Sequence, residues 1–204
     1  PGTRPDPRAA PDSGALIRPA TEGPRALPCG PLSLAMVAHP ARLGKTGAGR
    51  PGPEAETIVT IFAFTCIRNE GPFLLEWIAY HRLIGVTDFL IFSNDCTDGS
   101  DRLLSQLARH GVLRHIPQEI RPGKSPQWQA LQEVAKGGAT AGHDWAMFTD
   151  VDEFAVIHTG QRTLADAIAA VPGDADAIAL PWRLFGAAGQ AEFHDAPVTA
   201  HVRD

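Results

Sequence analysis

From residue 58 onward, apolar runs typical of buried strands alternate with segments that carry apolar residues at helical spacing. The strand-like runs span residues 58–66, 88–93, 112–116, 144–149 and 177–180, and the helix-like segments span residues 73–84, 100–110, 125–136 and 163–171. Strands that alternate with helices of about a dozen residues form βαβ units, whose mainly parallel sheet is flanked by helices. The sequence therefore predicts an α/β fold.

Local signals at the ends of these helices support the same pattern. Pro72 and Gly85 bracket the first helix, and Ser125 followed by Pro126 is a favourable start for the third. Thr163 and Asp166 have the spacing of a capping box at the start of the fourth helix. These signals predict where helices begin and end.

The first 57 residues differ in composition from the rest of the chain. They hold 11 of the 18 prolines, 8 of the 20 glycines and no aromatic residue, so they bury too little apolar surface to offset the entropy of the chain. We predict a disordered Pro/Gly/Arg-rich tail over 1–57 and a folded domain over 58–204. Because the chain begins with Pro, we expect it to be processed or a fragment of a longer protein.

Charge and cysteine content exclude several function classes. Residues 58–204 carry 18 acidic and 11 basic side chains, which argues against a nucleic acid as the main ligand and favours a cation between the protein and any phosphate. The three cysteines form no C-x-x-C pair, so the sequence indicates neither a disulfide framework nor a zinc cluster. No apolar run approaches the ~18 residues of a membrane span. We expect a cytoplasmic location, with peripheral association at the inner membrane as an alternative.

The predicted strand at 144–149 runs directly into three carboxylates, Asp150, Asp152 and Glu153. On an extended backbone, Asp150 and Asp152 point the same way and can share one cation, while Val151 points into the core. Mn²⁺ or Mg²⁺ often takes one or two carboxylates plus the phosphates of a substrate. A solvated acidic turn after the strand is the alternative interpretation.

Two more polar clusters follow strand-like runs. Residues 68–70 follow the first run and residues 94–98 follow the second. In open α/β sheets, ligands bind beyond the carboxyl ends of the strands. We therefore expect both clusters to lie near the acids at 150–153.

Five residues of these two clusters have candidate roles, and the three acids among them have alternatives. Arg68 suits a phosphate, while Asn69 and Glu70 suit a base or ribose edge; Glu70 is also favourable near the first turn of a helix. Asp95 and Asp98 could each bind a ribose hydroxyl or a base. The alternative for Asp95 is an ordinary turn residue, and for Asp98 we favour a helix cap.

Further candidates lie outside these clusters. Lys124 precedes a predicted helix N-terminus, where phosphates bind readily, but it also fits a solvated loop. Trp182 and Arg183 suit stacking against an acceptor sugar, although core packing accounts equally well for Trp182 and Phe185. His81 is interpreted as a packed interior residue rather than a ligand.

Several motifs together resemble a known enzyme group. They are Cys66-Ile67-Arg68-Asn69-Glu70-Gly71, Glu76-Trp77-Ile78-Ala79-Tyr80-His81, Ser93-Asn94-Asp95-Cys96-Thr97-Asp98-Gly99, Gln129 to Leu131 and Phe148 to Phe154. In this order, over about residues 60 to 186, they resemble the bacterial family 2-type glycosyltransferases and are similar to the family 92 group.

The resemblance implies a GT-A fold and transfer of a sugar from a nucleotide-diphosphate sugar to a hydroxyl acceptor. It places Asp150 and Asp152 at the metal-binding D-x-D, with Mn²⁺ or Mg²⁺ as cofactor, and Asp95 at the donor-nucleotide acid. Asp152 is the surer metal ligand, and Asp150 also faces the donor ribose. Arg68, Asn69 and Glu70 would line the nucleotide pocket.

The catalytic base is not marked by a motif. Glu192 and Asp195 are the available candidates, and we expect the domain to be incomplete at its C-terminus. Two alternatives stay open: a non-catalytic nucleotide-sugar or glycan-binding remnant of this fold, and a metal-dependent nucleotidyl or phosphoryl transferase.

Overall fold

The computed structural model describes residues 35–38, 58–173, 175–185 and 196–201, all within the compact unit Leu32–Asp204. These residues contain one six-stranded sheet with the order β4-β3-β2-β5-β1-β6. The strands are β1 (Ala35–Ala38), β2 (Ile61–Ile67), β3 (Asp88–Ser93), β4 (Arg114–Pro117), β5 (Trp145–Phe148) and β6 (Ala177–Ala179).

The four strands β2 to β5 are parallel to one another, and β1 pairs antiparallel with both β5 and β6. The prediction of an α/β fold with a mainly parallel sheet is confirmed for this part of the chain. Strand β1 was not predicted, because residues 35–38 lie in the segment assigned to the disordered tail. The rest of 1–57 lies outside the described residues.

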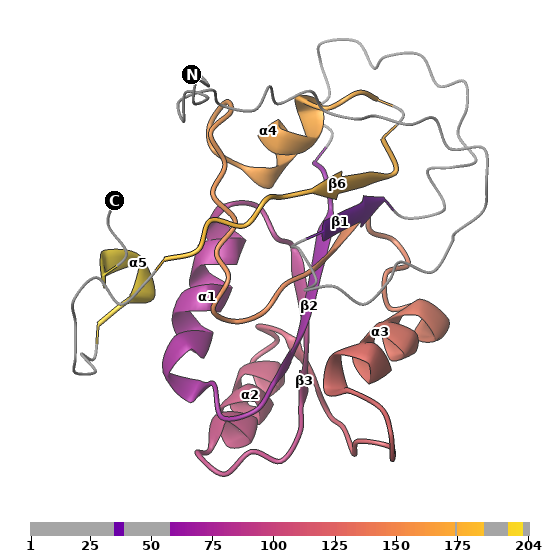
Figure 1. Cartoon of the computed structure of the whole chain (residues 1–204), viewed down its shortest axis with the longest axis vertical. Coiled ribbons are helices and arrows are strands. Elements are labelled where there is room, and N and C mark those ends of the chain that lie inside the picture. Colours follow the sequence, from indigo (N-terminus) through magenta and orange to yellow (C-terminus); the bar gives the residue numbers. More distant parts are fainter. Residues whose placement is uncertain (1–34, 39–57, 174, 186–195, 202–204) are drawn as a thin grey trace, which may run out of the picture. The chain divides into compact units, whose positions relative to one another are not determined.

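Helices cover both faces of the sheet (Figure 1). They are α1 (Gly71–Leu83), α2 (Ser100–Arg109), α3 (Pro126–Gly137), α4 (Leu164–Ala169) and α5 (Val198–His201). On β2, Ile61, Ala63 and Ile67 belong to the core formed with α1 and α2, whereas Phe62 and Phe64 pack with α3 on the other face. This alternation follows from the two-residue period of a strand.

The predicted helix starts are confirmed by side-chain hydrogen bonds. The Ser125 hydroxyl accepts from the backbone N–H of Trp128 at the start of α3. Thr163 and Asp166 form the predicted capping box at the start of α4. The described residues contain no helix that is both long enough and apolar enough to cross a membrane.

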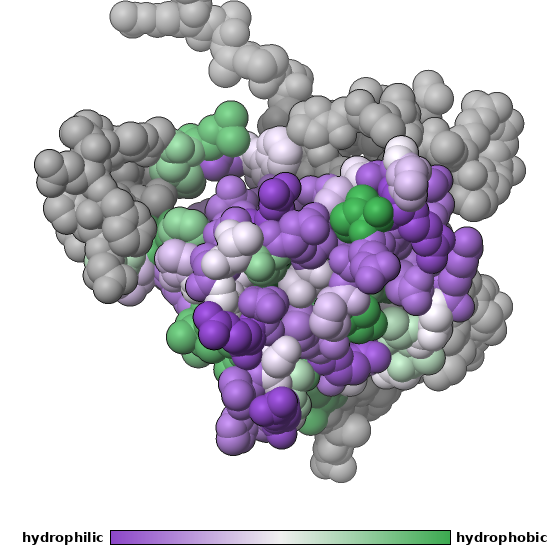
Figure 2. Space-filling model, turned by 90° about the horizontal axis from the view of Figure 1, so that it is seen from below, coloured by the Kyte–Doolittle hydropathy of each residue, from purple (hydrophilic) through white to green (hydrophobic). Residues whose placement is uncertain are grey.

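The strand order creates a switch point between β2 and β5. Strands β3 and β4 extend the sheet to one side of β2, while β5 lies on the other side. Ligands of open α/β sheets bind at the carboxyl ends of strands where the order reverses in this way. Figure 2 views the molecule from that side, and the coloured residues there are mainly hydrophilic with hydrophobic ones scattered among them.

Candidate functional site

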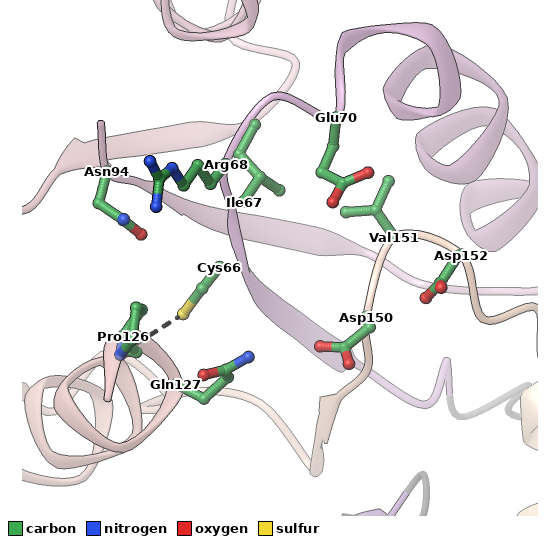
Figure 3. A pocket seen from close by; sticks show the side chains of 10 residues that line it. All are labelled: Cys66, Ile67, Arg68, Glu70, Asn94, Pro126, Gln127, Asp150, Val151 and Asp152. Atoms are coloured by element: carbon green, nitrogen blue, oxygen red, sulfur yellow. Dashed lines mark hydrogen bonds between the residues drawn. The ribbon is translucent and has the colours of Figure 1, made fainter. Parts of the chain in front are cut away.

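A pocket with a volume of about 270 Å³ lies at the carboxyl ends of β2 and β5 (Figure 3). The end of β2 and its loop, the residue after β3, the start of α3 and the turn after β5 all contribute to it. It is lined by Cys66, Ile67, Arg68, Glu70, Asn94, Pro126, Gln127, Asp150, Val151 and Asp152. Three of the predicted polar clusters therefore meet in one pocket.

The strand register explains why the end of β2 and the acidic turn are neighbours. Phe64 of β2 lies opposite Phe148, the last residue of β5. Two residues further along, Cys66 and Asp150 extend into the same space from adjacent parallel strands. Both line the pocket, and Asp150 helps to raise the pKa of the Cys66 thiol.

The acids after β5 form a turn rather than an extended segment. The backbone N–H of Glu153 donates to the carbonyl oxygen of Asp150 at 3.1 Å. The Glu153 carboxylate accepts from the Thr149 hydroxyl at 3.0 Å and from the Asp150 N–H at 3.1 Å. The expected extended geometry is thus wrong, although Val151 does point into the core and is 3% exposed.

Glu70, Asp150 and Asp152 bring three carboxylates together in this pocket (Figure 3). Burial raises the pKa of Asp150, and the charges of Glu153 and Asp152 add to that effect. Burial likewise raises the pKa of Glu70, followed by the charges of Asp152, Asp150 and Asp98. Like charges held this close disfavour the ionised forms, so a positive ligand would stabilise them.

Arg68 is the one basic side chain among the residues that line the pocket. It is exposed, and its guanidinium has no hydrogen-bond or ion-pair partner within the described part of the chain. Figure 3 shows it turned toward Asn94 and away from Asp150. It is therefore available to a phosphate or carboxylate of a ligand.

No group of three or more His, Cys, Asp or Glu side chains that could hold a metal ion occurs in the described residues. Asp150 and Asp152 still supply the carboxylate oxygens that hard cations prefer, and they lie two residues apart on one turn. Because burial, followed by the charges of Glu153 and Asp152, raises the pKa of Asp150, a cation would stabilise its ionised form. The residues present fit a Mg²⁺ or Mn²⁺ that is completed by ligand phosphates.

Asn69, Asp95 and Asp98 lie beside the pocket and are not among the residues that line it. The Asn69 side-chain oxygen accepts from the backbone of residues 97 and 98. The N-cap residue of α2 is Gly99, and the preceding Asp98 accepts from the N–H and hydroxyl of Ser100, the first residue of that helix. Asp95 is exposed, has a φ of 50°, and accepts from the Asn94 amide at 3.1 Å. Their donor-binding roles stay predictions.

The remaining candidates are not among the pocket residues. Lys124 is exposed in the loop before α3. Trp182 and Phe185 are 43% and 50% exposed, and the Arg183 guanidinium lies 5.2 Å from the centre of the Phe185 ring. Core packing of the two aromatic rings is thus wrong, while an acceptor-binding role stays a prediction. Glu192 and Asp195 lie outside the described residues.

His81 occupies the interior position that the sequence suggested. It is fully buried, and its Nδ1 lies 2.9 Å from the carbonyl oxygen of Trp77. Burial lowers its pKa to about 4, against a smaller opposite effect of the hydrogen bond to Trp77. Its ring packs between Trp77 and Phe154.

Three polar lining residues had no individual role assigned from the sequence, although Asn94 belongs to the cluster 94–98 that was expected near the acids. Asn94 is 7% exposed at the end of β3, and Gln127 lies in the first turn of α3. Burial, followed by the charge of Asp150, raises the pKa of the Cys66 thiol to about 12, which makes it a poor nucleophile. The position of Gln127 two residues after the predicted cap Ser125 was the available signal for that residue.

The fold and this pocket define a class: an α/β domain with an acidic binding site at the switch point of its parallel strands. The family model for glycosyltransferase family 92 matches residues 65–188. This match covers more than half of the chain and includes every residue that lines the pocket. The chain belongs to glycosyltransferase family 92.

Plant members of that family are similar to this chain. A glycosyltransferase family 92 protein of Ricinus communis is 32% identical over 58% of this chain and 21% of its own length. One of Oryza sativa subsp. japonica is 32% identical over 51% of this chain and 17% of its own length. One of Arabidopsis thaliana is 34% identical over 44% of this chain and 15% of its own length.

The chain therefore spans about a fifth of the length of the curated relatives it matches. No solved structure matches it. The expected similarity to family 92 is confirmed, whereas the grouping with bacterial family 2-type enzymes stays a prediction.

Proposed function

We propose that this chain is the donor-binding part of a metal-dependent glycosyltransferase with a GT-A fold. It would bind a nucleotide-diphosphate sugar in the pocket between β2 and β5 and transfer the sugar to a hydroxyl acceptor. The observation that carries the proposal is the meeting of Glu70, Asp150 and Asp152 in one pocket of a family 92 domain with Arg68, which has no partner among the described residues.

The charges of the pocket favour a phosphorylated ligand together with a cation. Three carboxylates would repel a diphosphate on their own. Burial, followed by the charges of neighbouring acids, raises the pKa of Glu70 and of Asp150. A divalent cation placed between carboxylates and phosphates would remove both conflicts. Arg68 adds a planar donor that matches phosphate oxygens from the other side of the pocket.

In this proposal Asp150 and Asp152 hold the cation, Mn²⁺ or Mg²⁺. Such an ion neutralises charge on a departing diphosphate. Glu153 keeps both aspartates in place through its hydrogen bonds to Thr149 and to the Asp150 N–H. Asn94 and Gln127 offer amide groups to the nucleoside from β3 and α3.

The acceptor side of the reaction rests on fewer residues. Trp182 and Arg183 are exposed and offer a stacking surface for a sugar ring. Glu192 and Asp195 stay the candidate bases for deprotonation of the acceptor hydroxyl. The cytoplasmic location is retained as part of the proposal.

Calorimetric titration with UDP and with GDP, each with and without Mn²⁺, tests the proposal on the unmodified chain and on Asp152→Ala. We expect one nucleoside diphosphate to bind in a way that requires both Mn²⁺ and Asp152. Asp101→Ala is the matched control, because it removes an acidic side chain on α2 outside the pocket. This variant should bind as the unmodified chain does. The proposal fails if binding is absent or indifferent to metal and to Asp152.

Release of free sugar from a nucleotide-sugar donor separates the two open interpretations of a binding-competent chain. Metal-dependent release would support an active enzyme. Binding without release, and without transfer to any hydroxyl acceptor offered, would indicate the non-catalytic alternative.

A further inference from the structure

Two side chains beside the pocket make reciprocal contacts between the loops that follow β2 and β3. The Asn69 side-chain oxygen accepts from the backbone N–H of Thr97 at 2.7 Å and of Asp98 at 3.3 Å. It also accepts from the Thr97 hydroxyl at 3.3 Å. A side chain of the first loop thus binds the backbone of the second.

Asp98 returns this contact from the second loop. One of its carboxylate oxygens accepts from the backbone N–H of Gly71 at 3.1 Å, at the start of α1. The other accepts from the N–H and the hydroxyl of Ser100, at 2.9 and 2.6 Å, at the start of α2. We call Asn69, Gly71, Thr97, Asp98 and Ser100 the loop clasp.

The backbone of the first loop is shaped for these contacts. Asn69 has a φ of 62°, a left-handed conformation that asparagine tolerates better than most residues. At Gly71, an added Cβ would lie 3.1 Å from the Asp98 carboxylate, closer than most real contacts, so the small residue permits the approach. Both features are local costs that the hydrogen bonds between the loops offset.

We infer that the loop clasp positions Arg68 and Glu70 for the ligand, and that Asn69 acts through its acceptor oxygen instead of touching the nucleotide. Arg68 and Glu70 are the chain neighbours of Asn69, so fixing Asn69 fixes the peptide units on both sides. This inference rests on the proposed function, because the pocket these two side chains line is the proposed donor site.

Little else among the described residues holds these two side chains. The Arg68 guanidinium has no partner there, and the Glu70 side chain makes no capping hydrogen bond to α1. Their positions therefore depend on the backbone that carries them. A positioning group whose loss misplaces two ligand-binding side chains weakens binding without itself contacting the ligand.

The Asn69 amide offers two chemistries that substitution can separate. Asn69→Asp keeps an acceptor oxygen for Thr97 and Asp98 but removes the amide donor that a nucleotide would contact. Asn69→Gly keeps the left-handed backbone at low cost but removes the acceptor. A positioning role predicts that the first variant retains binding and the second loses it, whereas direct contact predicts that both lose it.

The test is calorimetric titration of the full chain with UDP and Mn²⁺, together with amide hydrogen exchange at Thr97 and Gly71. For Asn69→Gly we expect about a tenfold or larger loss of affinity, as for other small displacements of binding groups, and faster exchange at Thr97. For Asn69→Asp we expect affinity within about threefold of the unmodified chain when added salt screens the new charge, and slow exchange retained.

Thr163→Ala is the control for general destabilisation. It removes the cap of α4, whose Leu164 N–H donates to Ile84 after the far end of α1. The change should lower the melting temperature yet leave affinity within about twofold, as for distant independent sites.

Equal loss of affinity in Asn69→Asp and Asn69→Gly would overturn the positioning role in favour of direct contact. Unchanged affinity or unchanged exchange in Asn69→Gly would overturn the loop clasp while the proposed function stands. If the unmodified chain binds no nucleoside diphosphate, both the proposed function and the positioning role fail.

Discussion

Carboxylates at the amino end of the parallel sheet accept hydrogen bonds from nearby donors, whereas those that line the pocket at the carboxyl end lie beside other acids. At the amino end, Asp144 accepts from the N–H and the hydroxyl of Thr60, both at 3.0 Å, and Asp88 lies 2.8 Å from the His143 ring. The hydrogen bond from His143 is the main reason that the pKa of Asp88 is lowered. At the carboxyl end, burial and neighbouring acids raise the pKa of Asp150 and Glu70.

This difference separates scaffold from site. A carboxylate that only holds the fold together is placed beside donors, which favour its ionised form. A carboxylate that lies beside other acids, by contrast, is stabilised in its ionised form when a cation arrives with the ligand. Asp88 and Asp150 thus take opposite pKa shifts at opposite ends of the sheet, whereas hydrogen bonds from Ser100 and Gly71 lower the pKa of the cap residue Asp98 at the carboxyl end. Perturbed pKa values like that of Asp150 are typical of functional sites.

The largest expected effect on stability is at the amino end. Asp144→Ala removes the side-chain acceptor of the Thr60 N–H and the nearer of the two acceptors of the Thr60 hydroxyl, which should lower the free energy of unfolding by about 2–3 kcal/mol. Denaturant unfolding measures the loss. Asp144→Asn, which retains an acceptor oxygen, should lose less, and both variants should keep metal-dependent UDP binding if they are folded. If a folded Asp144 variant lost as much UDP binding as Asp152→Ala without losing stability, the scaffold role of Asp144 would be contradicted.

Asp150→Asn should have the opposite effect on stability. It removes a half-buried negative charge that faces Glu153 and Asp152, so the free energy of unfolding should rise, by no more than about 1 kcal/mol because solvent screens the group. The same variant should lose Mn²⁺-dependent nucleotide binding. The comparison between the two ends breaks down if the variant is clearly less stable than the unmodified chain.

The pH dependence of stability should differ between the two ends. The folded-state pKa of Asp88 lies below the ordinary value of 3.8. Its contribution to stability is therefore present above that value and is lost as pH falls through the folded pKa. For Glu70, with a pKa raised above 4.5, stability instead falls as pH rises through that value and the folded pKa.

Urea unfolding followed across the acidic range, with Asp88→Asn and Glu70→Gln as matched variants, checks both signs. The first variant should flatten the loss at low pH, and the second should flatten the decline that begins near the ordinary pKa of glutamate. If the free energy of unfolding changed with pH in the same way in both variants, the two ends of the sheet would not differ.

The smallest expected effect concerns the thiol of Cys66. With a pKa of about 12, it should react slowly with iodoacetamide at neutral pH. Asp150→Asn removes the second cause of that raised pKa and should speed alkylation several-fold, leaving burial as the main obstacle. Peptide mass spectrometry resolves Cys66 from the other cysteines. Faster alkylation in Asp144→Asn as well would point to general loosening rather than to the charge of Asp150.

Strand and helix periodicity predicted nine of the elements along residues 58–180, because each contains its own apolar pattern and end signals. Strand β1 escaped detection, since Ala35–Ala38 is short, lies in Pro/Gly-rich sequence and is defined by its partners β5 and β6. Strand formation depends on neighbours more than on intrinsic preference.

The site was partly predictable for a related reason. The acids of the turn, Arg68 and Glu70 follow directly from their places after strands. Asn94 likewise belongs to the cluster 94–98 that was expected near the acids. The position of Gln127 depends on how α3 is set against that edge, which no local pattern encodes. Asn69 is a residue type that often binds ligands, but its side-chain oxygen already accepts a hydrogen bond from the backbone N–H of Thr97 in the neighbouring loop.

The insertion of β1 between β5 and β6 bears on how the protein can be shortened. In the described residues, β6 joins the sheet only through β1, and β1 also covers one edge of β5, which delivers the acidic turn. A version that begins at residue 58 would lack β1, so β6 would lose its partner strand. One edge of β5 would then carry backbone amide and carbonyl groups without hydrogen-bond partners. Such edges recruit strands from other molecules, so trimming the Pro/Gly-rich segment to aid crystallisation would invite self-association beside the binding pocket.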